Sequence, residues 1–197
     1  MKIAVDLDGV CYEWDRTARY MLKQYRGAVI PKGETEYWDY LKDAVSKQDW
    51  RWLWDEGVDK GLFRYGHMVK DARVGLEALV AAGHSILVVT HRPASAISDT
   101  VDWLSYFFRG IPIAGLHVLS NGEDKWRTGA DVLVDDKPQN IVNFYYNTDG
   151  TAILFDRPWN RELEAEMDSL YIAKGWREVV RIVGSLERHA RAAVSGE

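Results

Sequence analysis

Hydrophobic residues form five short runs spread along the chain, at residues 2–5, 85–89, 116–119, 131–134 and 151–155. The runs are continuous rather than alternating with polar residues, which is typical of strands covered on both faces. Helical patterns lie between and after these runs, at residues 72–82, 95–107, 140–146 and 177–189. Because strands alternate with helices, the pattern predicts an α/β fold with a Rossmann-like parallel sheet and right-handed crossovers.

The segment between the first and second predicted strands is too long for a plain crossover. Residues 12–68 contain helical patterns and most of the tryptophans. A structureless loop of this length is uncommon in a compact domain. We therefore expect residues 12–68 to form a small helical cap inserted after the first strand, and residues 1–11 and 69–197 to form the α/β core.

Chemically reactive side chains follow the ends of the predicted strands. Asp6 and Asp8 follow the first strand in the motif Asp-Leu-Asp-Gly-Val, Thr90 ends the second, and Asp135 and Asp136 follow the fourth. In open α/β sheets, ligands bind outside the carboxyl ends of the strands. This shared position predicts that the five residues belong to one site.

Converging carboxylates repel one another unless a cation lies among them. Oxygen ligands without cysteine favour a hard ion, so we expect Mg²⁺ as the cofactor. Lys125 offers a positive charge and Thr90 a hydroxyl donor for phosphate oxygens. His91 and Arg92 follow Thr90, in position to touch the phosphate or to cap a helix. This combination predicts phosphoryl transfer.

The order of these motifs resembles the four motifs of the haloacid dehalogenase superfamily. Over nearly the whole chain, the sequence also resembles the 5′(3′)-deoxyribonucleotidases and their phage and bacterial relatives. The segments that carry this narrower resemblance are the insertion after the first strand, Gly-Leu-Phe at residues 61–63, EDKW at 123–126, LVDDKPQN at 133–140, AILFDRPWN at 152–160 and GWREV at 175–179.

The resemblance implies a role for each acidic residue. Asp6 is implied as the nucleophile that takes the phosphoryl group. Asp8 is implied as the general acid that protonates the departing sugar oxygen and then as the base that deprotonates water. The implied metal ligands are Asp6, the backbone carbonyl of Asp8 and Asp136, with Asp135 behind them. The sequence leaves open which member of the Asp135–Asp136 pair binds the ion directly.

The tryptophans of residues 12–68 are candidates for stacking on a nucleobase, an interaction that contributes ~1–3 kcal/mol per base. The resemblance implies an aromatic residue near the base at Trp14, and Trp38 is aligned with a second. Trp54 is a further candidate. Trp50, Trp52 and Trp54 cannot all share one helical face, so some of them are expected to pack inside the cap.

The motif that follows the fifth strand favours a structural interpretation. In Asp156-Arg157-Pro158-Trp159-Asn160, proline sets the backbone of a turn and asparagine is suited to cap the next helix. We expect Arg157 to pair with an acidic residue near the site.

The composition limits the classes of partner that the protein is expected to bind. The 197 residues carry 25 Lys and Arg against 30 Asp and Glu, a formal net charge of −5, so we expect no broad cationic surface for a polymeric nucleic acid. The longest apolar run is short of the ~20 residues of a membrane helix. A single cysteine, Cys11, excludes an internal disulfide, and no secretory signal is visible. We expect a cytoplasmic protein (in the host cytoplasm if phage-encoded), and the resemblance implies a homodimer.

The sequence thus predicts a Mg²⁺-dependent phosphatase of (deoxy)ribonucleoside 5′-monophosphates. A phosphatase of another small phosphate ester or of a nucleic-acid end shares the same chemistry and is the first alternative. A phospho-receiver or a non-catalytic nucleotide-binding module is the second. Receivers also combine an acidic pair with Thr and Lys, but here the pair follows a late strand and a long insertion follows the first.

Overall fold

The computed structural model describes residues 1–33, 35–120, 122–165 and 170–195. Within them, the strands are β1 (Lys2–Val5), β2 (Ser85–His91), β3 (Ile113–Leu119), β4 (Val132–Asp135), β5 (Thr151–Phe155) and β6 (Tyr171–Ala173). The α-helices are α1 (Trp14–Arg26), α2 (Tyr40–Ala44), α3 (Lys47–Trp54), α4 (Glu56–Asp59), α5 (Ala72–Ala81), α6 (Ile97–Phe107), α7 (Pro138–Asn147) and α8 (Trp176–Ser195). Three 3₁₀ helices are η1 (Ala94–Ala96), η2 (Lys125–Thr128) and η3 (Pro158–Ala165).

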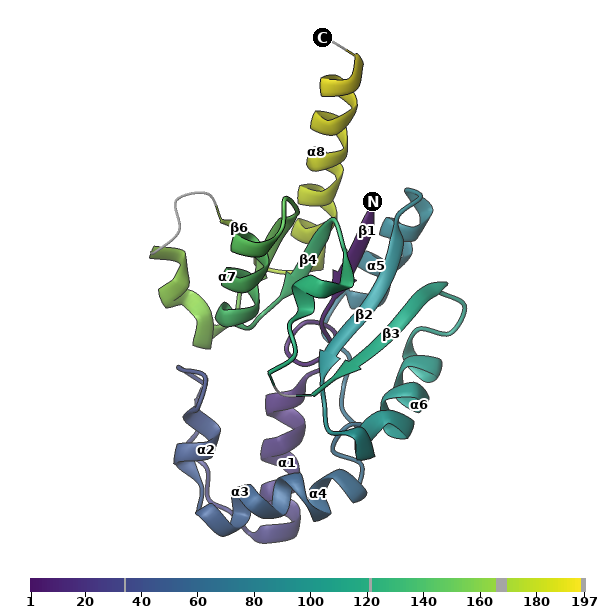
Figure 1. Ribbon diagram of the computed structural model, residues 1–197. Coiled ribbons are helices and arrows are strands. Elements are labelled where there is room, and N and C mark those ends of the chain that lie inside the picture. Colours follow the sequence, from purple (N-terminus) through teal and green to yellow (C-terminus); the bar gives the residue numbers. More distant parts are fainter. Residues whose placement is uncertain (34, 121, 166–169, 196–197) are drawn as a thin grey trace.

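The described strands form one sheet in the order β3-β2-β1-β4-β5-β6, and every pair of neighbours is parallel (Figure 1). This confirms the predicted Rossmann-like α/β fold. The strand order reverses between β1 and β4, because β2 and β3 lie on one side of β1 and β4 to β6 lie on the other. In such sheets the point of reversal is where ligands bind.

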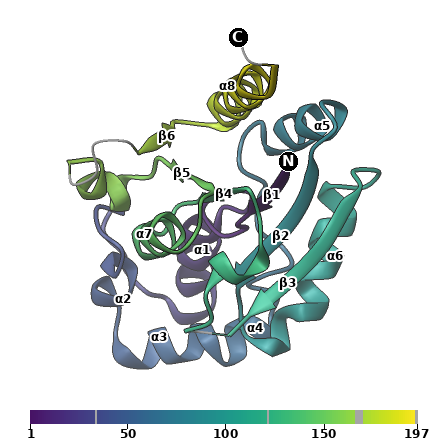
Figure 2. The same ribbon diagram turned by 45° about the horizontal axis from the view of Figure 1, so that its top comes forward.

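Helices cover both faces of the sheet, as the continuous apolar runs predict (Figures 1 and 2). On one face, α5, α6 and α8 pack on β1 and β2 through side chains that include Leu76, Trp103 and Val179. On the other face, α7 packs on β4 and β5 through Ile141 and Phe144. The central strands are therefore buried on both sides, which holds their carboxyl ends rigidly.

Helices α1 to α4 lie beyond the carboxyl ends of the strands, at the bottom of Figure 1. They have a core of their own, which includes Leu22, Leu53 and Leu62. The backbone of Tyr12 pairs with that of Met68 in an antiparallel bridge. We use the predicted boundaries, residues 12–68, to define the helical insertion. Among the described residues, no helix combines the length and the apolar character that crossing a membrane requires.

Several predicted elements differ from the structure in their bounds. β2 and β3 are longer than predicted, and α8 extends to Ser195. The sequence interpretation missed β6, because its three residues are too few to give a hydrophobic pattern. The predicted helix at 95–107 is divided into η1 and α6.

The contact between α5 and α8 gives a test of the packing. A Cβ on Gly75 in α5 would lie 2.4 Å from Cε3 of the buried Trp176 ring, whereas a Cβ on Gly184 in α8 would have its nearest neighbour at 3.6 Å. We expect Gly75→Ala to lower the free energy of unfolding by about 1–3 kcal/mol. Gly184→Ala should raise it by up to about 1 kcal/mol, because alanine favours a helix. Urea unfolding measures both, and equal effects would contradict this packing.

Candidate active site

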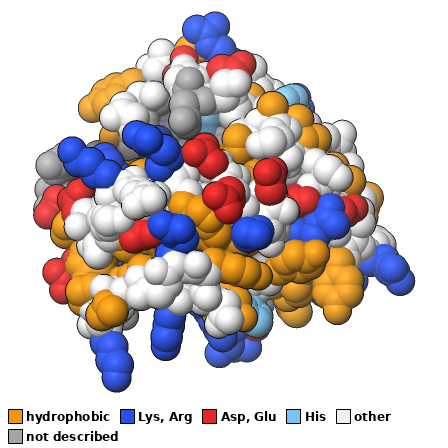
Figure 3. All heavy atoms as spheres, turned by 90° about the horizontal axis from the view of Figure 1, so that it is seen from below, with side chains coloured by type: hydrophobic (Ala, Val, Ile, Leu, Met, Phe, Trp, Pro, Cys, Tyr) orange, Lys and Arg blue, Asp and Glu red, His pale blue; other side chains and the backbone are white. Residues whose placement is uncertain are grey.

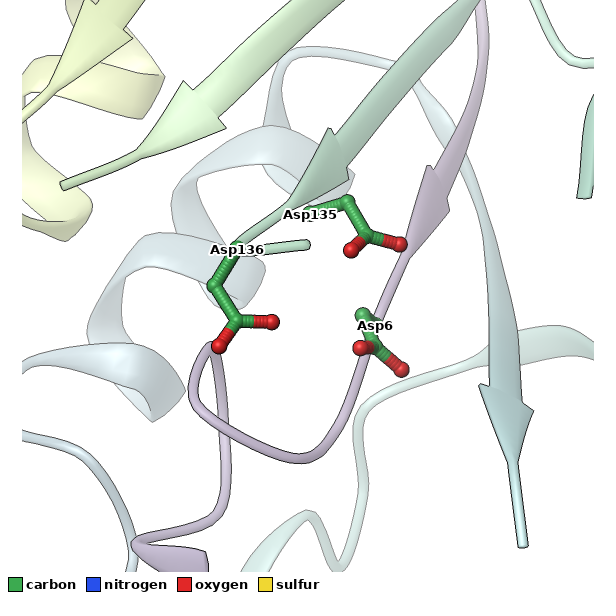
Figure 4. Close-up of side chains that lie close together, drawn as sticks. All are labelled: Asp6, Asp135 and Asp136. Carbon is green, nitrogen blue, oxygen red and sulfur yellow. The ribbon is translucent and has the colours of Figure 1, made fainter. Parts of the chain in front are cut away.

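Three carboxylates meet where β1 and β4 end side by side. Val5 is paired with Val134, and the backbone N–H of Asp6 donates to the carbonyl of Val134 at 3.0 Å. Asp6 therefore lies beside the end of β4, where Asp135 is the last strand residue and Asp136 follows. One oxygen from each carboxylate lies within 4.8 Å of the other two. Figure 4 shows the three side chains directed toward a common space.

Lys125 compensates part of this negative charge. Its Nζ lies 2.9 Å from Oδ1 of Asp6 and 2.6 Å from Oδ2 of Asp135, and its side chain is 1% exposed. Burial alone would lower the pKa of the ammonium group, but the charges of Asp135 and Asp6 outweigh burial and raise it. The lysine is therefore held in its charged form between the two carboxylates.

The carboxylate of Asp135 is fully occupied by donors. Besides Lys125, it accepts from the backbone N–H of Lys137 at 2.8 Å and from Nδ2 of Asn140 at 3.1 and 3.0 Å. Burial raises the pKa of Asp135, and the charge of Lys125 opposes that effect. These contacts fix the side chain as a support for Lys125.

Asp136 has fewer partners. Its Oδ2 accepts from the indole Nε1 of Trp159 at 3.0 Å, whereas Oδ1 is buried and has no hydrogen-bond partner among the described residues. Burial, and then the charges of Asp135 and Asp6, raise the pKa of Asp136 well above its usual range. Gly9 makes room for this carboxylate: its φ is +82°, and a Cβ would lie 2.0 Å from Oδ2.

This arrangement fits a hard divalent cation. The donors are oxygens of three buried carboxylates, of which Lys125 contacts two. Oδ1 of Asp136 has no hydrogen-bond partner among the described residues. A buried anionic oxygen without a partner is costly, and a bound cation removes that cost. The residues present therefore match the chemistry of a Mg²⁺ site.

Arg92 binds Asp8. The sequence, in contrast, predicts that Arg92 contacts the phosphate or caps a helix. The guanidinium donates from Nε and Nη2 to the two oxygens of Asp8 at 2.9 and 2.6 Å, and from Nη1 to Thr100 at 3.0 Å. It lies between the rings of Tyr12 and Phe63, 4.8 and 4.6 Å from their centroids. Burial raises the pKa of Asp8, while Arg92 opposes the rise. The side chain turns back toward the ends of the insertion because these two rings enclose it.

Thr90 and His91 lie at the end of β2, beside the acidic cluster. The Oγ1 of Thr90 is buried and has no hydrogen-bond partner among the described residues. The Nε2 of His91 lies 2.8 Å from the carbonyl oxygen of Glu123. Both residues line a cavity.

The cavity has a volume of about 250 Å³ and extends from the acidic cluster to the insertion. All three predicted aromatic residues line it: Trp14 and Trp54 are stacked at 5.7 Å, and Trp38 is half exposed. Trp50 also lines it, packed edge-on against Trp14, and the sequence interpretation did not assign Trp50 to the site. Trp52 is buried elsewhere in the insertion, so one of the three closely spaced tryptophans does pack inside the cap. On the face seen from below, acidic and basic side chains lie around hydrophobic ones (Figure 3).

The segment after β5 contacts the site more closely than predicted. Arg157 donates from Nε to the carbonyl of Gly9 at 2.6 Å, and its Nη2 lies 3.9 Å from the carboxylate of Glu13. Asn160 donates from Nδ2 to the carbonyls of Asp136 and Phe155, so the expectation that it caps the next helix is replaced by these contacts. The position of the motif, directly after a strand, was the signal that could have found them.

Solved structures share this fold. A haloacid dehalogenase-like family hydrolase from Xanthomonas campestris matches with a TM-score of 0.61 at 13% identity, covering 96% of this chain and 97% of that one. The D,D-heptose 1,7-bisphosphate phosphatase of B. bronchiseptica, solved with magnesium and phosphate, matches with a TM-score of 0.55 at 10% identity, covering 94% and 99%. These likenesses show that the chain has a haloacid dehalogenase-like fold.

Sequence comparison specifies the family. The chain belongs to the family described as 5′ nucleotidase, deoxy (pyrimidine), cytosolic type C protein, whose model matches residues 1–191. A protein of Chlorobaculum tepidum named "Putative 5′(3′)-deoxyribonucleotidase" is 27% identical over 198 residues, which cover 92% of this chain and 89% of the relative. The chain is thus an enzyme, a phosphatase of the nucleotidase kind.

The lysine at the centre of the cluster gives a prediction on stability. Lys125→Met leaves two buried carboxylates without their cation, so we expect the free energy of unfolding to fall by about 3 kcal/mol or more in EDTA. Lys137→Met is the matched control, because the ammonium of Lys137 lies over the half-exposed Trp38 ring at 5.4 Å. Urea unfolding compares the two variants. A similar small loss for both would show that Lys125 does not stabilise the cluster.

Proposed function

We propose that this enzyme is a Mg²⁺-dependent phosphomonoesterase that hydrolyses (deoxy)ribonucleoside 5′-monophosphates. The observation that carries the proposal is the position of the acidic cluster, which opens on a cavity walled by tryptophans. The family supports a nucleotide substrate, and the name of the Chlorobaculum tepidum relative supports a deoxyribose. A cytoplasmic location and a homodimer stay predictions.

Asp6, Asp136 and the backbone carbonyl of Asp8 are the groups that we propose to hold Mg²⁺. Asp135 stands behind them and orients Lys125. When bound, the ion supplies positive charge that offsets the negative charge of the phosphate and the carboxylates. The unpartnered Oδ1 favours Asp136 over Asp135 as the direct ligand.

In the first step, a carboxylate oxygen of Asp6 attacks the phosphorus of the substrate. The bond between phosphorus and the sugar oxygen breaks, and Asp8 donates the proton that this oxygen needs to leave as a hydroxyl. Arg92 fixes the side chain of Asp8 for this transfer. Thr90 and Lys125 donate to the phosphate oxygens.

In the second step, water attacks the phosphorus of the aspartyl-phosphate and gives its proton to Asp8. The bond between the Asp6 oxygen and phosphorus breaks, so that inorganic phosphate leaves and the Asp6 carboxylate is restored. Splitting one displacement into two lowers the barrier to each. The cavity walls exclude bulk water from the reacting groups.

The nucleophile has a direct test. Asp6→Asn should lower kcat by about three orders of magnitude or more, because an amide oxygen cannot take the phosphoryl group. Asp59→Asn, the same change at an exposed residue of α4, should leave kcat unchanged. Phosphate release measures both, and circular dichroism confirms that each variant folds. Substantial turnover by folded Asp6→Asn would refute the assigned nucleophile.

The substrate class is tested with a panel of nucleoside monophosphates and sugar phosphates. The proposal expects 5′-deoxyribonucleotides to have the highest kcat/KM. Equal rates across the panel would favour the alternative, a phosphatase of other small phosphate esters. A stable phospho-aspartate without multiple turnover would favour a receiver instead.

The aromatic wall makes a separate prediction. Trp38→Ala should raise KM for a nucleotide about 5- to 100-fold, because stacking on a base contributes ~1–3 kcal/mol. The half-exposed position of Trp38 makes the fold tolerant of this change. KM for ribose 5-phosphate, which has no base, is the control and should stay constant. A parallel rise in both KM values would place Trp38 outside the base site.

A further inference from the structure

We propose that Trp159 is a positioning residue for the metal site. Its indole N–H holds one oxygen of Asp136 and so directs the other oxygen, Oδ1, toward the cation. The inference rests on the proposed function in one respect, the binding of a divalent cation by Asp136. It gives a role to the motif after β5, which the sequence interpretation treated as a structural turn.

The two oxygens of Asp136 have different surroundings. Oδ2 accepts from Nε1 of Trp159 at 3.0 Å, and the backbone at Gly9 approaches it so closely that only glycine fits there. Oδ1 is buried and has no partner among the described residues. The indole contact therefore fixes the orientation of the carboxylate, and Oδ1 is the oxygen left for a ligand.

The chemistry of the donor suits this role. An indole N–H donates one hydrogen bond and carries no charge, so it orients a carboxylate without neutralising it. The neighbouring Asp135 differs, because Lys125 supplies a full positive charge to it at 2.6 Å. Asp136 thus accepts only a neutral hydrogen bond, and its other oxygen is left to bind a cation. Groups that orient metal ligands in this way tune the affinity for the metal.

Trp159 and its acceptor are anchored to the same backbone. Asn160 donates from Nδ2 to the carbonyl of Asp136 at 2.7 Å and to that of Phe155 at 2.9 Å, and it accepts from the backbone N–H of Arg157 at 3.0 Å. These bonds join the end of β5 to Asp136. The indole and the carboxylate are consequently held in a fixed relation, which an orienting contact requires.

The ring of Trp159 also lines the cavity that we propose for the nucleotide. One side chain therefore contacts a metal ligand through its N–H and the substrate space through its ring. Removing the N–H while keeping an aromatic ring separates these two contributions.

The test is the affinity of the protein for Mn²⁺, a paramagnetic substitute for Mg²⁺, in the absence of substrate. The electron paramagnetic resonance signal of the free ion measures this affinity. We expect Trp159→Phe to weaken binding about tenfold or more. Trp52→Phe is the matched control, because it makes the same change in the insertion core, outside the cavity, and should leave the affinity unchanged. Unchanged affinity in folded Trp159→Phe would overturn the inference.

The dependence of activity on the Mg²⁺ concentration gives a second test. Phosphate release by Trp159→Phe should fall at low Mg²⁺ and recover toward the wild-type value at saturating Mg²⁺. A role limited to the fold or to contact with the substrate predicts a loss that Mg²⁺ does not restore. If the wild type binds Mn²⁺ with the expected dependence on Trp159 but hydrolyses no nucleotide, the proposed function fails and this inference stands. If the wild type binds no Mn²⁺, both fail.

A measurement on the wild type covers the case in which Trp159→Phe does not fold. The indole N–H resonance of Trp159 in a nitrogen–proton correlation spectrum should shift on addition of Mg²⁺, with the same midpoint as metal binding. That of Trp52 should not shift. An unchanged Trp159 resonance at saturating Mg²⁺ would contradict the contact between the metal ligand and the indole.

Discussion

The repulsion among three buried carboxylates is the constraint on which the rest of the site depends. Asp6, Asp135 and Asp136 come together because β1 and β4 are parallel neighbours, with Val5 at the end of β1 paired with Val134. The ammonium group of Lys125 bonds to Asp6 and Asp135, and no described residue forms an ion pair with Asp136. Under the proposed function, a divalent ion offsets the negative charge of this buried cluster.

The surrounding side chains orient the acids rather than neutralise them all. Asn140 fixes Asp135, the indole of Trp159 fixes one oxygen of Asp136, and Gly9 leaves room for that oxygen. Asp8 is separated from the cluster by its pairing with Arg92. Three of the acids thus converge on one point, whereas the fourth pairs with Arg92, and the proposed mechanism assigns the proton transfers to this fourth acid.

The sequence predicted five of the six described strands and the acidic motifs that follow them. Continuous apolar runs predict buried strands, and the end of a parallel strand is a fixed place, so Asp6, Thr90 and Asp136 could be assigned to one edge. Contacts that depend on packing between distant segments could not be predicted. Arg92 meets Asp8 because Tyr12 and Phe63, from the two ends of the insertion, enclose it. Trp159 reaches Asp136 only because β5 lies beside β4.

We infer that one cation and one phosphoryl group share the space between Asp6 and Asp136. A crystal structure with Mg²⁺ and beryllofluoride, which mimics a phosphoryl group on a carboxylate, would reveal both positions. Mg²⁺ is expected on Asp6 and Asp136, and the mimic on Asp6 within reach of Thr90 and Lys125. An ion bound away from these carboxylates, or a mimic attached to another residue, would refute the inferred site.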